Sequence, residues 1–506
     1  MFVRKKPNKS GLISVQIIDK SSGNYKVVKT IGSSSDSDQL LLLVKKAKLE
    51  IDNITKQGRL LFEKSEEVEF IDTFVNQIES LSLVGPELLL GKIFDEIGFN
   101  LIEDELFRHL VITRLVYPVS KLKTTDYLFK YKGIQMSVYS IYRYLDKLHK
   151  HQIKRVQDIS LAHTLKLFNN HLSVVFYDVT TLYFEASDED DLRKTGFSKD
   201  GKHQQPQIVL GLLVSAGGYP LDYDIFEGNK YEGDTLMPIL KHFQTKHKPE
   251  HLIVIADAGL LSNKNIEALK ENKLQFILGA RIKNESNTIK NAILNLHLKD
   301  GESEKISYDE NSIKLIVCYK EKRAKKDAQN RKRGLEKLEK NLKAGKFTKK
   351  NINNKGYNKY LKLEGEVNIE IDYNKYKDDA KWDGLKGYMT NTGLKKEEII
   401  QQYSQLWEIE KTFRISKSDL QIRPIYHHLK KRIESHICIS FAACKIYKEL
   451  ERQLKEKKSE LSPEKAIDIL KTINQITIQS PYSNNLLSRL ILKTDEQKDL
   501  IALFGL

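Results

Sequence analysis

An acidic residue inside a strongly apolar segment constrains the fold of this chain more than any other feature. Residues 174–179 read VVFYDV, and this run of β-branched and aromatic residues predicts a buried strand that Asp178 interrupts. Because burying an unpaired carboxylate costs several kcal/mol, Asp178 needs a basic partner, a proton or a metal ion. Asp257 repeats the pattern at the end of the run IVIA. Open α/β sheets carry their sites at such strand ends, although an Asp there also commonly caps the following turn.

A third acid lies in a segment with helical periodicity, LWEIEKTFR. At about 100° per residue, Glu410 falls between Leu406 and Trp407 on the apolar face of this predicted helix. A carboxylate on that face needs a partner. An ion pair with Arg414 or Lys417 and a functional role are both open interpretations.

Three carboxylates are what a divalent-metal site for phosphoryl transfer needs. Mg²⁺ is a hard cation that takes oxygen ligands, whereas His and Cys suit softer metals. Two such ions about 4 Å apart activate the attacking oxygen and stabilise the leaving oxygen. Asp178, Asp257 and Glu410 are therefore candidate metal ligands.

The charge balance favours a polyanionic partner, most often nucleic acid. The 506 residues include 84 Lys and Arg against 68 Asp and Glu, a net charge of +16. Residues 320–350 hold 14 basic and 4 acidic residues, which indicates either a segment that tracks phosphates or a solvated helix face. The three cysteines lack the spacing of a disulfide framework or a zinc site. With neither a signal peptide nor a long apolar stretch, we expect a cytoplasmic protein without a membrane partner.

Changes in pattern along the chain predict an N-terminal β-hairpin, a helical domain and an α/β layer with a mixed sheet. The helical domain is either a helix-turn-helix-like DNA-binding domain or an ordinary support domain. The expected segments are the hairpin (1–37), the helical domain (38–171), the first part of the α/β core (172–281), an insertion (282–393), the Glu-bearing helix with the helix after it (394–445), and a C-terminal helical tail (446–506).

With its three acids, the sequence resembles the DDE-class transposases of bacterial insertion sequences, and most of all the insertion-sequence-four superfamily. That superfamily carries a Tyr-x2-Arg-x3-Glu-x6-Lys signature on the helix with the catalytic Glu. Tyr403, Glu410 and Lys417 fit this spacing, whereas Leu406 occupies the Arg position and Arg414 lies one turn beyond Glu410.

This resemblance implies an α/β fold with a ribonuclease H-like catalytic core. A largely β, lysine-rich insertion would separate the second Asp from the Glu, and the N-terminal β-hairpin and helical domain would precede the core. The site residues that the resemblance implies are Asp178, Asp257 and Glu410 as catalytic residues and ligands of Mg²⁺, which Mn²⁺ can replace, and Tyr403, Arg414 and Lys417 as DNA-binding residues.

The implied activity is that of a DNA transposase, which cleaves at insertion-sequence ends and transfers the freed 3′-OH into target DNA. Its partners would be the double-stranded terminal repeats and the target DNA, bound by a homodimer in a synaptic complex in the prokaryotic cytoplasm, associated with the nucleoid. Two alternatives are a ribonuclease H-like, structure-selective nuclease without strand transfer, and a non-catalytic DNA-binding repressor from a decayed element. The three intact acids argue against decay.

Overall fold

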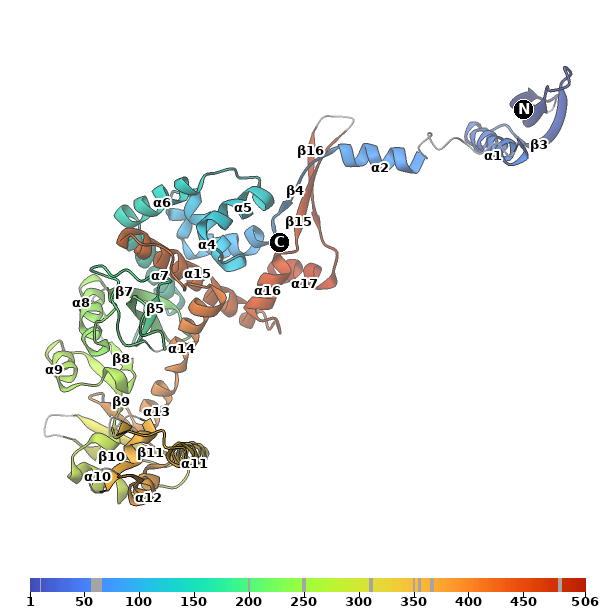
Figure 1. Cartoon of the computed structure of the whole chain (residues 1–506). Helices are drawn as coiled ribbons and strands as arrows, with labels where there is room; N and C mark the ends of the chain where they lie inside the picture. The colour runs from blue at the N-terminus through green and yellow to red at the C-terminus, as the bar shows by residue number, and fades with distance from the viewer. Residues whose placement is uncertain are drawn as a thin grey trace. The chain divides into compact units, whose positions relative to one another are not determined.

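The computed structural model describes residues 1–9, 11–55, 66–198, 201–247, 252–308, 313–348, 351–353, 356–364, 368–480 and 485–506 (Figure 1). The chain divides into two compact units. The first comprises residues 1–81 and 476–489, and the second comprises residues 82–475 and 490–506.

In the first unit, helix α1 (Ser37–Thr55) covers an antiparallel sheet of three strands, β1 (Phe2–Pro7), β2 (Ile13–Asp19) and β3 (Lys26–Ser34). Strands β2 and β3 pair across residues 20–25, and β1 adds a strand that no pattern in the sequence indicates. Another sheet has the order β16-β15-β4. The remaining elements of this region are α2 (Glu66–Asn76), β4 (Ile78–Leu83), β15 (Asn474–Gln479) and β16 (Leu486–Ile491).

An eight-stranded mixed sheet, with the order β10-β11-β14-β9-β8-β5-β6-β7, is the centre of the second unit. Strands β5, β8 and β9 are parallel neighbours, and the other neighbouring pairs are antiparallel. The predicted α/β architecture with a mixed sheet is therefore confirmed. The strands are β5 (Val174–Tyr183), β6 (Gln207–Ser215), β7 (Pro220–Glu227), β8 (Ile253–Ala256), β9 (Gln275–Ala280), β10 (Ser303–Ser307), β11 (Lys314–Tyr319) and β14 (Leu385–Thr390).

Helices precede, interrupt and follow this sheet, and none of those described is long and apolar enough to cross a membrane. The helices are α3 (Lys92–Ile97), α4 (Glu105–Val116), α5 (Lys121–Lys132), α6 (Val138–His151), α7 (Ile153–Leu167), α8 (Leu236–His247), α9 (Asn263–Glu271), α10 (Asn287–Leu294), α11 (Glu321–Lys343), α12 (Tyr373–Asp379), α13 (Lys396–Ser404), α14 (Trp407–Arg414), α15 (Lys430–Glu456), α16 (Pro463–Leu470) and α17 (Asp495–Phe504).

The two faces of β5 pack against different helices. Val175 and Tyr177 belong to one hydrophobic core with residues of α8 and α9. Phe176 and Leu182 belong to another core, shared with α4, α14 and α15. Because successive side chains of a strand point to opposite faces, Asp178 lies on the face that α14 and α15 cover.

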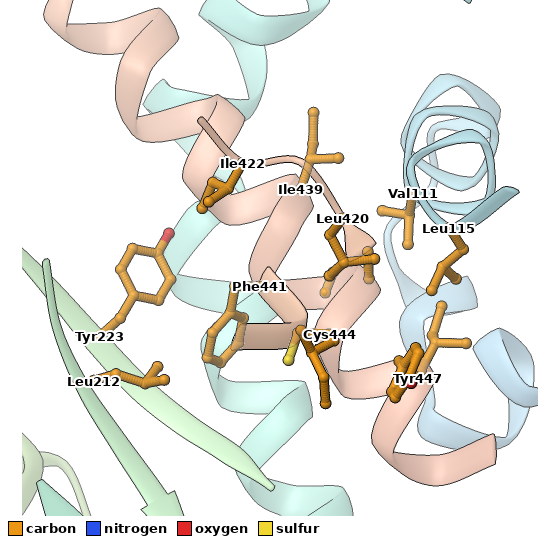
Figure 2. Close-up of a cluster of buried hydrophobic side chains, with 14 of the residues drawn as sticks. Val111, Leu115, Leu212, Tyr223, Leu420, Ile422, Ile439, Phe441, Cys444 and Tyr447 are labelled. Atoms are coloured by element: carbon orange, nitrogen blue, oxygen red, sulfur yellow. The ribbon is translucent and has the colours of Figure 1, made fainter. Parts of the chain in front are cut away.

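Helix α15 links the sheet to the helices that precede it. Its side chains are buried along most of its length, so α15 contacts neighbours on all sides. In Figure 2, Phe441 of α15 lies beside Leu212 and Tyr223 of the sheet, while Val111 and Leu115 of α4 lie on the opposite side of α15.

Residues 282–393 contain helices as well as strands, so this segment differs from the expected, largely β insertion. Strands β10, β11 and β14 extend the sheet beyond β9. A further two-stranded sheet pairs β12 (Leu361–Glu364) with β13 (Asn368–Ile371). The basic run forms α11, because its many Lys, Arg and Glu residues favour a helix and it has few β-branched residues. Residues 349–350 of that run lie outside the described residues.

Replacing Phe441 with alanine is expected to lower the free energy of unfolding by about 3–5 kcal/mol, because it opens a cavity between α15 and the sheet. Phe441 is only 5% exposed. Urea unfolding followed by tryptophan fluorescence measures this loss, since both tryptophans, Trp382 and Trp407, lie in the second unit.

The matched control for this prediction is Phe129→Ala on α5, where the side chain is 58% exposed. This exposed substitution is expected to change the free energy of unfolding by about 0.5 kcal/mol or less. Equal losses in the two variants would contradict the assignment of Phe441 to the core.

Candidate active site

Asp178 and Asp257 lie at the same level of two neighbouring parallel strands. Strands β5 and β8 pair with Tyr177 opposite Ala256, and the next residue of each segment is one of the two acids. Neighbouring strands are about 4.8 Å apart. Because side chains alternate along a strand, both acids belong to the face of the sheet that α14 and α15 cover. The structure thus brings the two aspartates side by side.

The Asp257 carboxylate is exposed and is held through one oxygen. Its Oδ1 accepts a hydrogen bond from the backbone N–H of Ala258 at 2.7 Å and another from the Tyr403 hydroxyl at 3.4 Å. Asp257 therefore caps the turn that follows it and also contacts Tyr403, which precedes Glu410 by seven residues. Within the described part of the chain, Oδ2 has no protein hydrogen bond.

Burial and the negative charges of all three candidate acids raise the pKa of the Tyr403 phenol. This residue of α13 is 4% exposed, and burial raises the pKa of its phenol above the ordinary range. The charge of Asp257, its hydrogen bond, and the charges of Asp178 and Glu410 raise the pKa further. Tyr403 therefore stays protonated at neutral pH and serves as a hydrogen-bond donor.

The expectation that Glu410 lies on a buried helix face is wrong, because Glu410 is exposed. Trp407, expected on the same face, is 53% exposed. Glu408 lies on the more buried side, with its carboxylate 3.5 Å from the Lys448 ammonium. Trp407 and Glu410 do share a face of α14, but it is the exposed face, whereas Ile409 and Phe413 lie on the buried face. The expectation fails because it took Trp407 for a core residue.

The candidate DNA-binding residues occupy three successive helical segments. Tyr403 lies in α13, Arg414 is exposed at the end of α14, and Lys417 is half-buried in a π-helical turn (Ile415–Asp419). The signature spacing therefore does not correspond to one straight stripe of a single helix.

Lys386 is a basic residue near the site that no pattern in the sequence indicates. It lies on β14, and its Nζ is 4.5 Å from the centre of the Tyr403 ring. Burial and the nearby Arg323 lower the pKa of Lys386, whereas the charge of Asp257 opposes that shift. Beside it lies a cavity of about 460 Å³, which we call the basic cavity; its lining includes Lys320, Lys322, Arg323, Lys326 and Lys386.

The absence of a side chain at Gly279 of β9 leaves room for the Tyr403 hydroxyl. A Cβ at this position would lie 2.5 Å from the Tyr403 oxygen and 2.9 Å from the backbone nitrogen of Ala258. A glycine inside a strand often marks such a close approach, so the sequence QFILGA carried a usable signal.

The donor chemistry of the site fits a hard divalent cation, because Asp178, Asp257 and Glu410 supply only carboxylate oxygens. The Oδ2 atom of Asp257 is a donor without a protein partner among the described residues. In the same part of the chain, no three His, Cys, Asp or Glu side chains are grouped closely enough to hold a metal ion.

Gly279→Ala is expected to lower the free energy of unfolding by about 1–3 kcal/mol, because the added methyl group overlaps the Tyr403 hydroxyl. The same substitution in a Tyr403→Phe background is expected to cost less, since the overlapping oxygen is gone. A double-mutant cycle from urea unfolding measures this coupling.

Gly393→Ala is the matched control for this cycle, because a Cβ at Gly393 meets no atom within 4 Å. It is expected to leave stability nearly unchanged. If Gly279→Ala costs the same with and without the tyrosine hydroxyl, the close approach of Gly279 and Tyr403 is not what makes glycine necessary there.

No curated protein sequence matches the chain. Solved structures with partial similarity include a piggyBac transposase synaptic complex with hairpin DNA, which is 10% identical over 72% of this chain and 69% of that chain, with a TM-score of 0.39. A Mos1 transposase paired-end complex with the left transposon end is 10% identical over 46% of this chain and 66% of that chain, with a TM-score of 0.16. The family described as the transposase DDE domain matches residues 169–444, which is more than half of the chain. This chain therefore belongs to the DDE transposase family.

Proposed function

We propose that this chain is a DNA transposase that cuts at the ends of an insertion sequence and joins the freed 3′-OH to target DNA. The observation that carries the proposal is the parallel register that puts Asp178 beside Asp257, together with the hydrogen bond from the Tyr403 hydroxyl to Asp257. Membership of the DDE transposase family supports it.

The strand order supports a ribonuclease H-like catalytic core within the larger sheet. Strands β5, β6 and β7 follow one another as antiparallel neighbours, and β8 and β9 add in parallel on the other side of β5. Asp178 lies on the central strand of this five-stranded part and Asp257 at the end of its parallel neighbour. Asp178 and Asp257 thus lie at the level where β8 ends, and strand ends of α/β sheets commonly form sites.

The proposed reaction has two displacements at phosphorus. A water oxygen attacks the phosphorus at the transposon end, the bond from phosphorus to O3′ breaks, and the leaving oxygen takes a proton to become a 3′-OH. That hydroxyl then loses its proton, attacks a target phosphodiester, and displaces the target O3′. In this proposal, Asp178, Asp257 and Glu410 would hold Mg²⁺, or Mn²⁺ in its place, which supplies charge stabilisation of the attacking and leaving oxygens.

Tyr403 acts mainly as a positioning residue in this proposal, because it is buried and donates its hydroxyl to Asp257. Its hydrogen bond fixes Oδ1 of Asp257 and leaves Oδ2 for the cation. Arg414 and Lys417 follow Glu410 along the chain and are the proposed ligands of DNA phosphates, since both carry side-chain donors suited to phosphate.

The distribution of charge supports double-stranded DNA as the partner. Helix α11 and the basic cavity concentrate positive charge beside Tyr403, and a basic groove of this kind tracks phosphates without reading sequence. The spacing of Tyr403, Glu410 and Lys417 supports the insertion-sequence-four superfamily. We further propose a homodimer on paired terminal repeats, in the prokaryotic cytoplasm.

Asp178→Asn, Asp257→Asn and Glu410→Gln are each expected to abolish strand cleavage while DNA binding persists, because each removes a carboxylate charge and little volume. The measurement is release of a 3′-OH, with Mg²⁺, from DNA carrying the ends that flank this gene. Binding of the same DNA is measured by fluorescence anisotropy.

The control for this series is Glu397→Gln, at an exposed position in the first turn of α13, which is expected to cleave like the wild type. A variant of the series that still cuts removes its residue from the site. A wild type that binds the ends without cutting them favours a repressor, and one that cuts without joining favours a nuclease.

Lys417→Ala is expected to reduce cleavage less than any carboxylate variant, because the side chain would contact phosphate and no metal ion. Loss of one phosphate contact lowers by about one the slope of log binding constant against log salt. A salt titration of end binding gives this slope. An unchanged slope would remove Lys417 from the DNA interface.

A further inference from the structure

A second cavity in the chain is basic and lies outside the carboxylate site. Its volume is about 400 Å³, and it lies among the end of α4, the start of α5, α6, α15 and the loop between residues 421 and 427. None of the residues that line it is Asp or Glu among those the structure describes. The lining residues that matter here are Arg114, Ser120, Lys121, Tyr142, Arg423 and His427.

Lys121 lines this cavity without a counter-charge. The residue is 6% exposed, and its ammonium has no hydrogen bond or ion pair within the described ranges. Burying an unpaired ammonium is costly, so the fold is less stable with a lysine here than with an apolar residue. The backbone N–H groups at the start of α5, which Ser120 caps, add positive potential at the same wall.

Arg114, which also lines the cavity, repeats this situation. It is 6% exposed, and its two closest polar partners are the Leu420 carbonyl and Nδ1 of His436, each at 3.5 Å. Both partners are uncharged: His436 donates from Nε2 to the Ile422 carbonyl at 3.0 Å, which leaves Nδ1 as an acceptor. The guanidinium therefore lacks an anion and keeps donors available.

The lowered pKa values of Lys121 and His427 agree with a positive charge in the pocket that no anion balances. Burial lowers the pKa of Lys121, and Arg114 lowers it further. Burial, Lys121 and Arg114 lower the pKa of His427 to about 3, so its ring is neutral at neutral pH. An anion in the cavity would oppose each of these shifts.

We propose that this Arg114–Lys121 pocket binds a backbone phosphate of the transposon-end DNA; the inference rests on the transposase function proposed above. A phosphate would supply the missing negative charge and accept from both cationic side chains. The pocket would thereby fix the register of the duplex at a point separate from the cut, since phosphate contacts position a protein on DNA.

The position of the pocket favours a phosphate of bound DNA over a free phosphate ion. Arg423 of its lining lies with its guanidinium 5.8 Å from the ring centre of Tyr183, at the end of β5. Asp178 lies five residues earlier on that strand, which corresponds to about 16 Å. The pocket and Asp178 therefore both lie near strand β5, close enough for one bound duplex to reach both. Tyr426, 67% exposed, also lines the pocket.

The test is Lys121→Met, compared with Lys130→Met at an exposed position of the same helix. Lys121→Met is expected to weaken binding of end DNA by about tenfold and to lower the salt slope by about one. It is also expected to raise the melting temperature by about 2–4 °C, since an unpaired buried charge is removed. Lys130→Met is expected to bind within about twofold of the wild type and to melt at the same temperature.

A scan of end DNA with single methylphosphonate linkages identifies the phosphate. One uncharged linkage is expected to weaken binding of the wild type and to have no effect on Lys121→Met. If wild type and Lys121→Met bind end DNA equally, the proposed phosphate-binding role of the pocket is overturned, while the transposase function stands. If Lys121→Met melts at a lower temperature than the wild type, Lys121 has a purely structural role, and the proposal is overturned as well.

Failure of the transposase function gives a different result. If wild type binds no end DNA, DNA is excluded as the ligand, and thermal shifts with inorganic phosphate decide what the pocket holds. A shift of the wild type that is absent in Lys121→Met would make it a site for free phosphate, and the absence of any shift would reject an anion site altogether.

Discussion

The hydrogen bond from the buried Tyr403 phenol to Asp257 is the interaction on which the rest of the candidate site depends. Like charges that lie close together repel, so the neighbouring carboxylates of Asp178 and Asp257 need donors and cations around them. Tyr403 supplies a hydrogen bond to Asp257, and Lys386 supplies a positive charge beside the Tyr403 ring. Tyr403 in turn fits only because β9 carries no side chain at the point of contact.

The acids on the strands could be located from the sequence because their signal is local. An apolar run interrupted or ended by one Asp indicates both the strand and the place of the acid, and the parallel register then puts Asp178 beside Asp257. The position of Glu410 could not be obtained in the same way. A helical wheel shows which residues share a face of a helix, but the tertiary structure decides which face is buried, and the face of α14 with Trp407 and Glu410 is exposed.

Other parts of the molecule were invisible to sequence patterns because they join distant segments. Lys386 reaches Tyr403 only through the pairing of β14 with β9. Arg114 and Lys121 look like ordinary residues of a basic helical region. Their unusual environment appears only when the loop near Ile422 and the start of α15 close over them. Burial of a charge without a partner is a property of the folded chain and leaves no periodicity in the sequence.

The continuity of the sheet has a consequence for how this chain can vary. Strand β14 follows the basic helix α11 in sequence, yet it hydrogen-bonds to β9 on one side and to β11 on the other. Without the inserted residues, β9 would become an open edge with unpaired backbone groups, which invites association with other chains. The insertion thus covers the edge of β9 by pairing β14 with it. A related chain with a shorter insertion would have to keep β14, or cover the edge of β9 by other means, to avoid association with other chains.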